Sequence, residues 1–176
     1  MEQERIYDSN HKLYNDFKRL YSQSFPIFEQ RTETQQEYAF NNENYHLIGY
    51  CSEGSFIGFI SFWEFKDYLY IEHFAINNEI RGKGYGSTIL NKFIKSTPKT
   101  ILLEIDPIID DISNARLRFY KRCGFWENPY SHTHPSYRDE YQPHHLIVLT
   151  TEKQLSEDEY QTFYKDLSVT VMKRLK

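Results

Sequence analysis

The first pattern along the chain is helical. Between residues 8 and 22, apolar side chains recur every three or four positions, which predicts an amphipathic helix. These side chains are Leu13, Phe17, Leu20 and Tyr21. Pro26 follows this helix, and the residue before a proline disfavours the helical conformation. Thr32 can then cap a second, short helix.

Apolar runs bounded by turn residues predict the strands. The expected strands cover residues 45–51, 55–64, 68–76, 100–105, 125–127 and 145–151. Tight polar turns join the first three, so we expect an antiparallel meander. A helix predicted over residues 84–96 connects the third strand to the fourth, and such a crossover lets these two strands run parallel.

Two more helices complete the pattern. One is expected over residues 113–123, with Gly124 as its C-terminal cap. The other is expected over residues 156–175, where Ser156 and Glu159 can form a capping box. Residues 128–143 are polar and interrupted by prolines, and we interpret them as an ordered loop. The sum is a mixed α/β fold.

Length and charge narrow the class of protein. The chain has 176 residues, which suits a single domain over residues 1–176. Hydrophobic residues make up 39% and aromatic residues 17%, enough for a substantial core. The formal net charge of −4 argues against general nucleic-acid binding, because such binding rests on a positive field over the phosphates.

The sequence also suggests a cytoplasmic protein without membrane association. The longest apolar run, residues 55–63, is far too short to span a bilayer. The start of the chain shows no basic segment followed by an apolar run, so no secretory signal is expected. Two cysteines, Cys51 and Cys123, cannot form a disulfide framework. The oligomeric state stays open, with a homodimer as one option.

A glycine-rich stretch at the junction of strand 68–76 and helix 84–96 carries the first chemical signal. Residues 81–86 read RGKGYG. A helix start presents unpaired N–H groups and a partial positive charge. Glycines let successive N–H groups turn toward one anion, and Arg81 and Lys83 add charge. The stretch is typical of a pyrophosphate cradle, although a turn that only tightens the crossover would use similar residues.

Two common nucleotide motifs do not match this stretch. A Walker A loop needs G-x-x-x-x-G-K-[ST], and a dinucleotide fold needs G-x-G-x-x-G, whereas the spacing here is G-x-G-x-G. Glu104 nevertheless lies at about the distance where a dinucleotide fold places its acidic residue. A nucleotide-binding α/β domain therefore stays open at this point.

Two segments together resemble the GNAT superfamily of N-acetyltransferases. Residues 71–90, IEHFAINNEIRGKGYGSTIL, are similar to its motif A, in which [R/Q]-x-x-G-x-[G/A] follows an apolar strand. Arg81, Gly84 and Gly86 fill the signature positions. Residues 114–125, NARLRFYKRCGF, resemble its motif B. The resemblance implies a GNAT-like α/β fold, with a mostly antiparallel sheet, one splayed parallel strand pair and flanking helices.

The resemblance implies acetyl-CoA as the co-substrate, bound where strands 71–76 and 100–105 part. Its pantetheine arm would pair with the backbone of Phe74 and Ile76. Asn114 would bond the pantetheine or hold the cleft. The pyrophosphate would rest on the glycine-rich stretch, formed by Arg81, Gly82, Lys83, Gly84, Tyr85, Gly86 and Ser87.

The implied reaction is acyl transfer to a primary amine. By resemblance, Tyr120 would act as the general acid that protonates the leaving sulfur. Glu72 is the favoured general base, acting directly or through water, because aromatic neighbours could raise its pKa. Strand alternation places Glu72 on the face of Phe74 and Ile76. His73, expected on the opposite face, is the rival base. A backbone N–H, that of Phe74, would stabilise the oxyanion.

The acceptor is not encoded in these motifs, and a small-molecule or peptide amine fits equally. Four histidines follow in the polar region, His132, His134, His144 and His145, but their spacing is not that of a zinc site and no metal is expected. We expect the 128–143 loop to line the acceptor pocket together with Phe25 and Phe28. A non-catalytic acyl-CoA-binding or regulatory module is the alternative function.

Overall fold

The computed structural model describes residues 1–80 and 82–175. Within them, eight strands form a sheet in the order β1-β2-β3-β4-β5-β8-β6, and β7 pairs with β8 off this path. The strands are β1 (Glu2–Arg5), β2 (Tyr45–Ser52), β3 (Ser55–Glu64), β4 (Tyr68–Ile76), β5 (Thr100–Ile105), β6 (Phe125–Glu127), β7 (His132–His134) and β8 (His144–Thr151). Neighbouring strands are antiparallel except β4 and β5, which are parallel.

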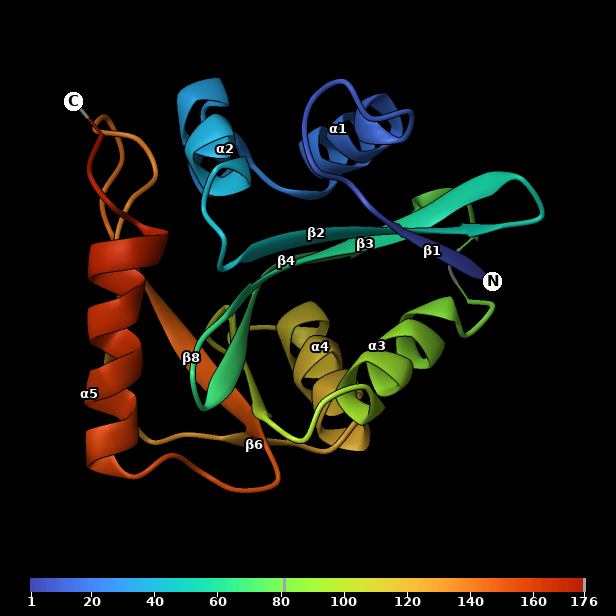
Figure 1. Cartoon of the computed structure of the whole chain (residues 1–176). Coiled ribbons are helices and arrows are strands. Elements are labelled where there is room, and N and C mark those ends of the chain that lie inside the picture. The colour runs from blue at the N-terminus through green and yellow to red at the C-terminus, as the bar shows by residue number, and fades with distance from the viewer. Residues whose placement is uncertain (81, 176) are drawn as a thin grey trace.

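Helices cover both faces of this sheet (Figure 1). They are α1 (Tyr14–Ser24), η1 (Ile27–Glu29), α2 (Glu33–Phe40), η2 (Asn78–Ile80), α3 (Tyr85–Lys95), α4 (Asp111–Arg122), α5 (Glu157–Asp166) and the π-helical η3 (Leu167–Val171). Figure 1 shows α1 and α2 above the meander, α3 and α4 below it, and α5 beside β8. None of the helices in the described residues has the length and apolar character needed to cross a bilayer.

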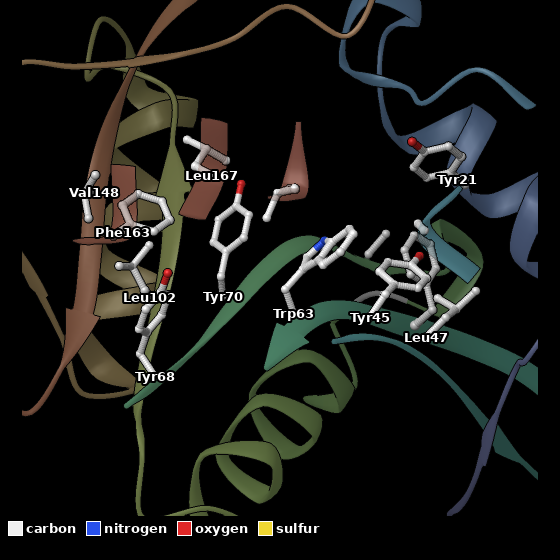
Figure 2. Packing of buried hydrophobic residues seen from close by; sticks show 14 of the residues in the cluster. Tyr21, Tyr45, Leu47, Trp63, Tyr68, Tyr70, Leu102, Val148, Phe163 and Leu167 are labelled. Atoms are coloured by element: carbon white, nitrogen blue, oxygen red, sulfur yellow. The ribbon is translucent and has the colours of Figure 1, made fainter. Parts of the chain in front are cut away.

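A separate apolar core lies on each face. The core under α1, α2 and α5 includes Phe17, Trp63, Tyr70 and Phe163. Figure 2 shows Tyr70 between Trp63 and Phe163, and the Tyr70 and Phe163 ring centres are 5.2 Å apart. The core under α3 and α4 includes Ile60, Leu90, Ile101 and Leu149. Each fully buried large apolar side chain contributes about 1.5–3 kcal/mol, so these two cores hold the helices against the sheet.

The predicted elements are confirmed, with shifts at several ends. The first helix begins at Tyr14 rather than near residue 8. Before it, the Asp8 carboxylate accepts from the N–H of Asn10, and the His11 ring nitrogen accepts from the N–H of Leu13. These local side-chain bonds offer the backbone an alternative to the helix, and so the chain turns instead.

Other differences lie at strand edges and at the C-terminal end. The short strand β1 pairs with β2, and β7 lies inside the region expected to be a loop. The closing helix is regular only to Asp166 and continues as a π-turn through Val171. That turn contains three successive β-branched residues, Val169 to Val171, which lowers helix propensity.

Candidate active site

The parallel strands β4 and β5 pair over only three residues each. Tyr68 aligns with Thr100 and Tyr70 with Leu102, after which β4 continues to Ile76 without β5 as a ladder partner. Beyond Tyr70, the edge of β4 that faces β5 therefore offers backbone N–H and C=O groups to an extended ligand. The expected splay of the two strands is confirmed.

A cleft of about 1160 Å³ opens along this splay. That is slightly above the usual range of ligand pockets, roughly 300–1,000 Å³. Its walls include most of the residues predicted from the sequence, namely Glu72, His73, Phe74, Ile76, Gly82, Gly84, Tyr85, Gly86, Ser87 and Tyr120. Phe25, Phe28 and Tyr137, from the predicted acceptor region, line the same cleft.

Three predicted coenzyme-binding residues stand apart from that set. Lys83 and Asn114 are exposed and are not among the described residues that line the cleft. On α4, the neighbouring Ala115 and Arg116 line it instead. Arg81 lies outside the described residues, so its predicted role stays a prediction.

The start of α3 has the backbone geometry that the predicted cradle requires. Gly84 is the N-cap with φ +77°, and Gly82 has φ +87°, both in the left-handed region that favours glycine. A Cβ at either position would meet nothing within 4 Å, so the backbone is open to a bound group. The N–H of Thr88 makes an intrahelical bond to Gly84. The first N–H groups of an α-helix have no partner inside the helix, so those of Tyr85, Gly86 and Ser87 are suited to face an anion.

Tyr120 lies on α4, on the wall of the same cleft. A capping box between Asp110 and Ser113 starts this helix and fixes its position after β5. The Tyr120 ring packs edge-on against Phe119 and Phe125. Burial raises the pKa of Tyr120 to about 12, so its hydroxyl keeps its proton at neutral pH and can donate it.

Glu72 does not lie on the face that alternation predicts. Ser61 pairs with His73 but the next residue, Phe62, pairs with Ile71, so Glu72 is the extra residue of a β-bulge. The bulge turns both Glu72 and His73 toward the face of α1 and α2. Phe74 and Ile76 remain on the opposite face. The predicted arrangement is wrong, because one inserted residue shifts the pleat.

The Glu72 carboxylate is fully buried and accepts four hydrogen bonds. Arg31 donates two, at 2.8 and 3.1 Å, Trp63 Nε1 donates one at 2.7 Å, and the Tyr137 hydroxyl donates one at 2.8 Å. Burial alone would raise the pKa of Glu72. The Arg31 guanidinium, His73 and these hydrogen bonds outweigh burial and lower the pKa to about 2. The expected rise of this pKa is therefore wrong.

His73 is also held by its surroundings. Its Nε2 lies 2.8 Å from the Glu29 carbonyl oxygen, and its ring packs edge-on against Tyr21 and Phe25. Because a carbonyl only accepts, Nε2 carries the hydrogen. Burial lowers the pKa of His73, which keeps the ring neutral near pH 7.

Sequence reasoning missed the groups that pair with these side chains. Arg31 and Tyr137 donate hydrogen bonds to Glu72, although they lie 41 and 65 positions from it in the sequence. His132 and His134 lie beside Glu104 rather than around a metal. Among residues 1–80 and 82–175, no group of three or more His, Cys, Asp or Glu side chains is arranged to hold a metal ion.

Known proteins share this fold. A protein from Bacteroides thetaiotaomicron, provisionally assigned to the GNAT family, superposes with a TM-score of 0.91 over 99% of this chain and 100% of its own, at 24% identity. A Bacillus subtilis acetyltransferase solved with CoA superposes with a TM-score of 0.60 over 86% of this chain and 98% of its own, at 15% identity.

Sequence comparison points the same way. YjbC of Bacillus subtilis, provisionally named an acetyltransferase, is 31% identical over 108 residues, which are 59% of this chain and 53% of YjbC. The match thus spans about half the length of that curated relative. Residues 10–125 match the model of the Acetyltransferase (GNAT) family. Since this match covers most of the chain, the protein belongs to the GNAT family of acetyltransferases.

Proposed function

We propose that this protein transfers an acetyl group from acetyl-CoA to a primary amine. The observation that carries the proposal is the edge of β4 beyond Tyr70, which runs unpaired with β5 along the cleft to the cradle at Gly84. An extended arm on that edge would end with its diphosphate at the start of α3. The hydroxyl-bearing Tyr120 faces the same cleft from α4.

The residues present fit the coenzyme. Backbone groups of Phe74 and Ile76 can pair with the pantetheine amides as an added strand would. The N–H groups from Gly82 to Ser87 suit the diphosphate, because two left-handed glycines and a helix start leave that backbone open. The related Bacillus subtilis structure with CoA supports this choice of donor.

The chemistry requires a proton acceptor and a proton donor. The amine nitrogen attacks the thioester carbonyl, a C–N bond forms and the C–S bond breaks. Tyr120 is the proposed donor to the leaving sulfur, since it keeps its proton far above neutral pH. We assign Glu72 to positioning rather than to proton transfer. A carboxylate that accepts four hydrogen bonds and has a pKa near 2 is a poor base for an ammonium group.

The donor site can be tested with a matched pair of variants. Gly84 and Gly54 have nearly the same φ, +77° and +78°, and both have open space where a Cβ would stand. Gly54 lies in the β2–β3 turn, so Gly54→Trp carries the same backbone strain without touching the cradle. In calorimetric titrations with coenzyme A, we expect wild type and Gly54→Trp to bind and Gly84→Trp to lose binding. No binding to wild type, or equal binding to both variants, would contradict the proposal.

The alternative is an acyl-CoA-binding module without catalysis. Such a module would give the same calorimetric result but would leave acetyl-CoA intact with every amine. Tyr120 on the cleft wall favours the enzyme, because a binding module has no need for a proton donor beside the thioester.

A further inference from the structure

A second ionisable cluster lies on the cleft wall formed by β5 and β7. The buried Glu104 carboxylate accepts from the Tyr70 hydroxyl on Oε1 and from His132 Nε2, at 2.5 Å, on Oε2. The other His132 nitrogen, Nδ1, lies 2.8 Å from the Tyr160 hydroxyl. Burial would raise the pKa of Glu104, but His134 and the bonds from His132 and Tyr70 lower it. Glu104 is therefore a fixed negative charge at the cleft.

His134 turns its Nε2 toward this charge. Its Nδ1 lies 2.6 Å from the carbonyl oxygen of Pro135. A carbonyl only accepts, so Nδ1 carries the hydrogen and the neutral ring has its lone pair on Nε2. That Nε2 lies 3.9 Å from Glu104 Oε1, too far for a hydrogen bond. Both side chains line the cleft.

The position of His134 is set from several sides. Its ring stacks near Tyr137, with centres 5.2 Å apart, and near His144, with centres 5.7 Å apart. The titratable groups that surround it are Glu104 on β5, His73 and Tyr70 on β4, His132 on β7, His144 on β8 and Tyr137. Glu104 is the carboxylate in this set, 3.9 Å from His134 Nε2.

We infer that His134 is the group that accepts the proton of the acceptor amine, and that Glu104 positions it and stabilises the imidazolium. The inference rests on the proposed function. A gap of 3.9 Å lets one amine nitrogen lie within about 3 Å of both His134 Nε2 and Glu104 Oε1. An ammonium group in this gap lies between the Glu104 carboxylate and His134 Nε2.

The proton balance is complete. The ammonium gives one proton to His134 Nε2, and the free amine attacks the thioester carbon. As the C–N bond forms and the C–S bond breaks, Tyr120 protonates the sulfur. The second nitrogen proton then restores the Tyr120 hydroxyl through water. His134 releases its proton to solvent, so each turnover yields one amide, one thiol and one proton.

Three rival bases are weaker on geometry or need separate testing. Glu72 has all four of its acceptor positions filled. His73 gives its Nε2 hydrogen to Glu29, and its Nδ1 lies 3.8 Å from Glu72, a carboxylate that Arg31 already pairs. Glu29 also lines the cleft, and burial, together with Asp106, raises its pKa to about 7. It titrates in the range expected for a base, so the experiment must separate it from His134.

The first test is the pH profile of kcat/KM, with n-propylamine, ethanolamine, glycinamide and spermidine as acceptor probes. His134→Asn keeps an N–H for the Pro135 carbonyl but removes the basic nitrogen. We expect kcat/KM to fall about 10²–10⁴-fold near neutral pH, with coenzyme A affinity unchanged. The rise of rate with pH near neutrality should give way to one that follows the amine's own pKa, about 10 for n-propylamine. His46→Asn, on β2 where the ring stacks on Phe62, is the matched control and should match wild type.

Two further variants separate the role of His134 from the roles of Glu104 and Glu29. Glu104→Gln removes the charge beside His134 Nε2, so kcat should fall while coenzyme A affinity stays unchanged, a split that loose packing would not produce. Glu29→Gln should retain the rise of rate near neutrality. Loss of that rise in Glu29→Gln together with its retention in His134→Asn would overturn the inference.

A second test needs no acceptor. Long-range ¹⁵N NMR of the histidine rings, assigned with His134→Asn, should show His134 with its hydrogen on Nδ1 at neutral pH, and Nε2 shifting when n-propylamine is added. A hydrogen on Nε2, or no response of that ring, would overturn the inference. If instead no amine releases thiol while the NMR result holds, the proposed function fails and the assigned ring chemistry stands.

Discussion

Arg31 and Glu72 form a two-pronged ion pair in which the side chains are only 3% and 0% exposed. Arg31 also donates to the carbonyl of Val171, and its guanidinium lies over the rings of Trp63 and Tyr137. The pair therefore ties the start of α2, the bulge in β4 and the C-terminal turn together behind the cleft. Because Glu72 directly precedes His73 and Phe74 on β4, the pair also helps to fix these two residues of the cleft wall.

Removing one member of this pair should destabilise the protein strongly. Arg31→Met leaves the Glu72 charge buried without its partner, and breaking a buried ion pair typically costs about 3–5 kcal/mol. Urea denaturation followed by tryptophan fluorescence measures the loss. Arg19→Met, which breaks the exposed pair with Asp16, is the control and should change stability little. Equal effects of the two variants would mean that the buried pair does not hold the fold.

The same pair predicts how stability depends on acid. Glu72 has a folded-state pKa of about 2, below its ordinary value of 4.5. A depressed pKa contributes stability that is full above the unfolded value and is lost as pH falls through the folded value. The free energy of unfolding should therefore drop between pH 4.5 and 2, and this drop should be smaller in Glu72→Gln. Parallel acid profiles for the two proteins would contradict the assigned pKa.

Near neutral pH, Glu29 should make stability change with pH in the opposite direction to Glu72. Its folded pKa is about 7, above the ordinary 4.5, because burial and Asp106 disfavour the charge. Between these values the folded state binds more protons, so stability falls as pH rises. Glu29→Gln should raise the melting temperature at pH 8 relative to wild type and leave it nearly unchanged at pH 4.5. Glu43→Gln, at an exposed turn position, should show no such pH-dependent gain.

Tyr120 should matter for turnover and little for binding. Tyr120→Phe removes the proposed proton donor, and we expect kcat to fall about 10²-fold with coenzyme A affinity retained. Tyr120 must be protonated to act as the donor, and its pKa is about 12. Deprotonation of Tyr120 should therefore not slow the wild-type enzyme below pH 10. Tyr50→Phe is the matched control, a buried tyrosine on β2 whose pKa burial also raises to about 12. Equal kcat in Tyr120→Phe and wild type would remove Tyr120 from the acid role.

Local sequence signals predicted most of the secondary-structure elements of the fold. The three-strand meander, the crossover helix and its start at Gly84 depend on spacing and turn residues within short segments, and the structure contains all of them. The capping boxes at Thr32 and Ser156 have the same local origin.

The environment of the reacting groups could not be predicted in this way. The bulge at Glu72 depends on how β4 pairs with β3, and one extra residue reverses which face a side chain takes. Arg31 lies 41 positions from Glu72, and His132 lies 28 positions from Glu104. Periodicity carries no information about such long-range partners. For that reason the pKa of Glu72 was predicted in the wrong direction and the Glu104–His134 pair was missed.

Acetyl transfer itself is the central claim, and mass spectrometry tests it most directly. Wild-type protein is incubated with acetyl-CoA and the amine probes, and the acetylated amine is counted against the free coenzyme A thiol. We predict equal amounts of the two products with at least one amine, and about a hundredth of that amount with Tyr120→Phe over the same time. Bound acetyl-CoA that stays intact with every amine, or thiol released without acetylated amine, would contradict the account.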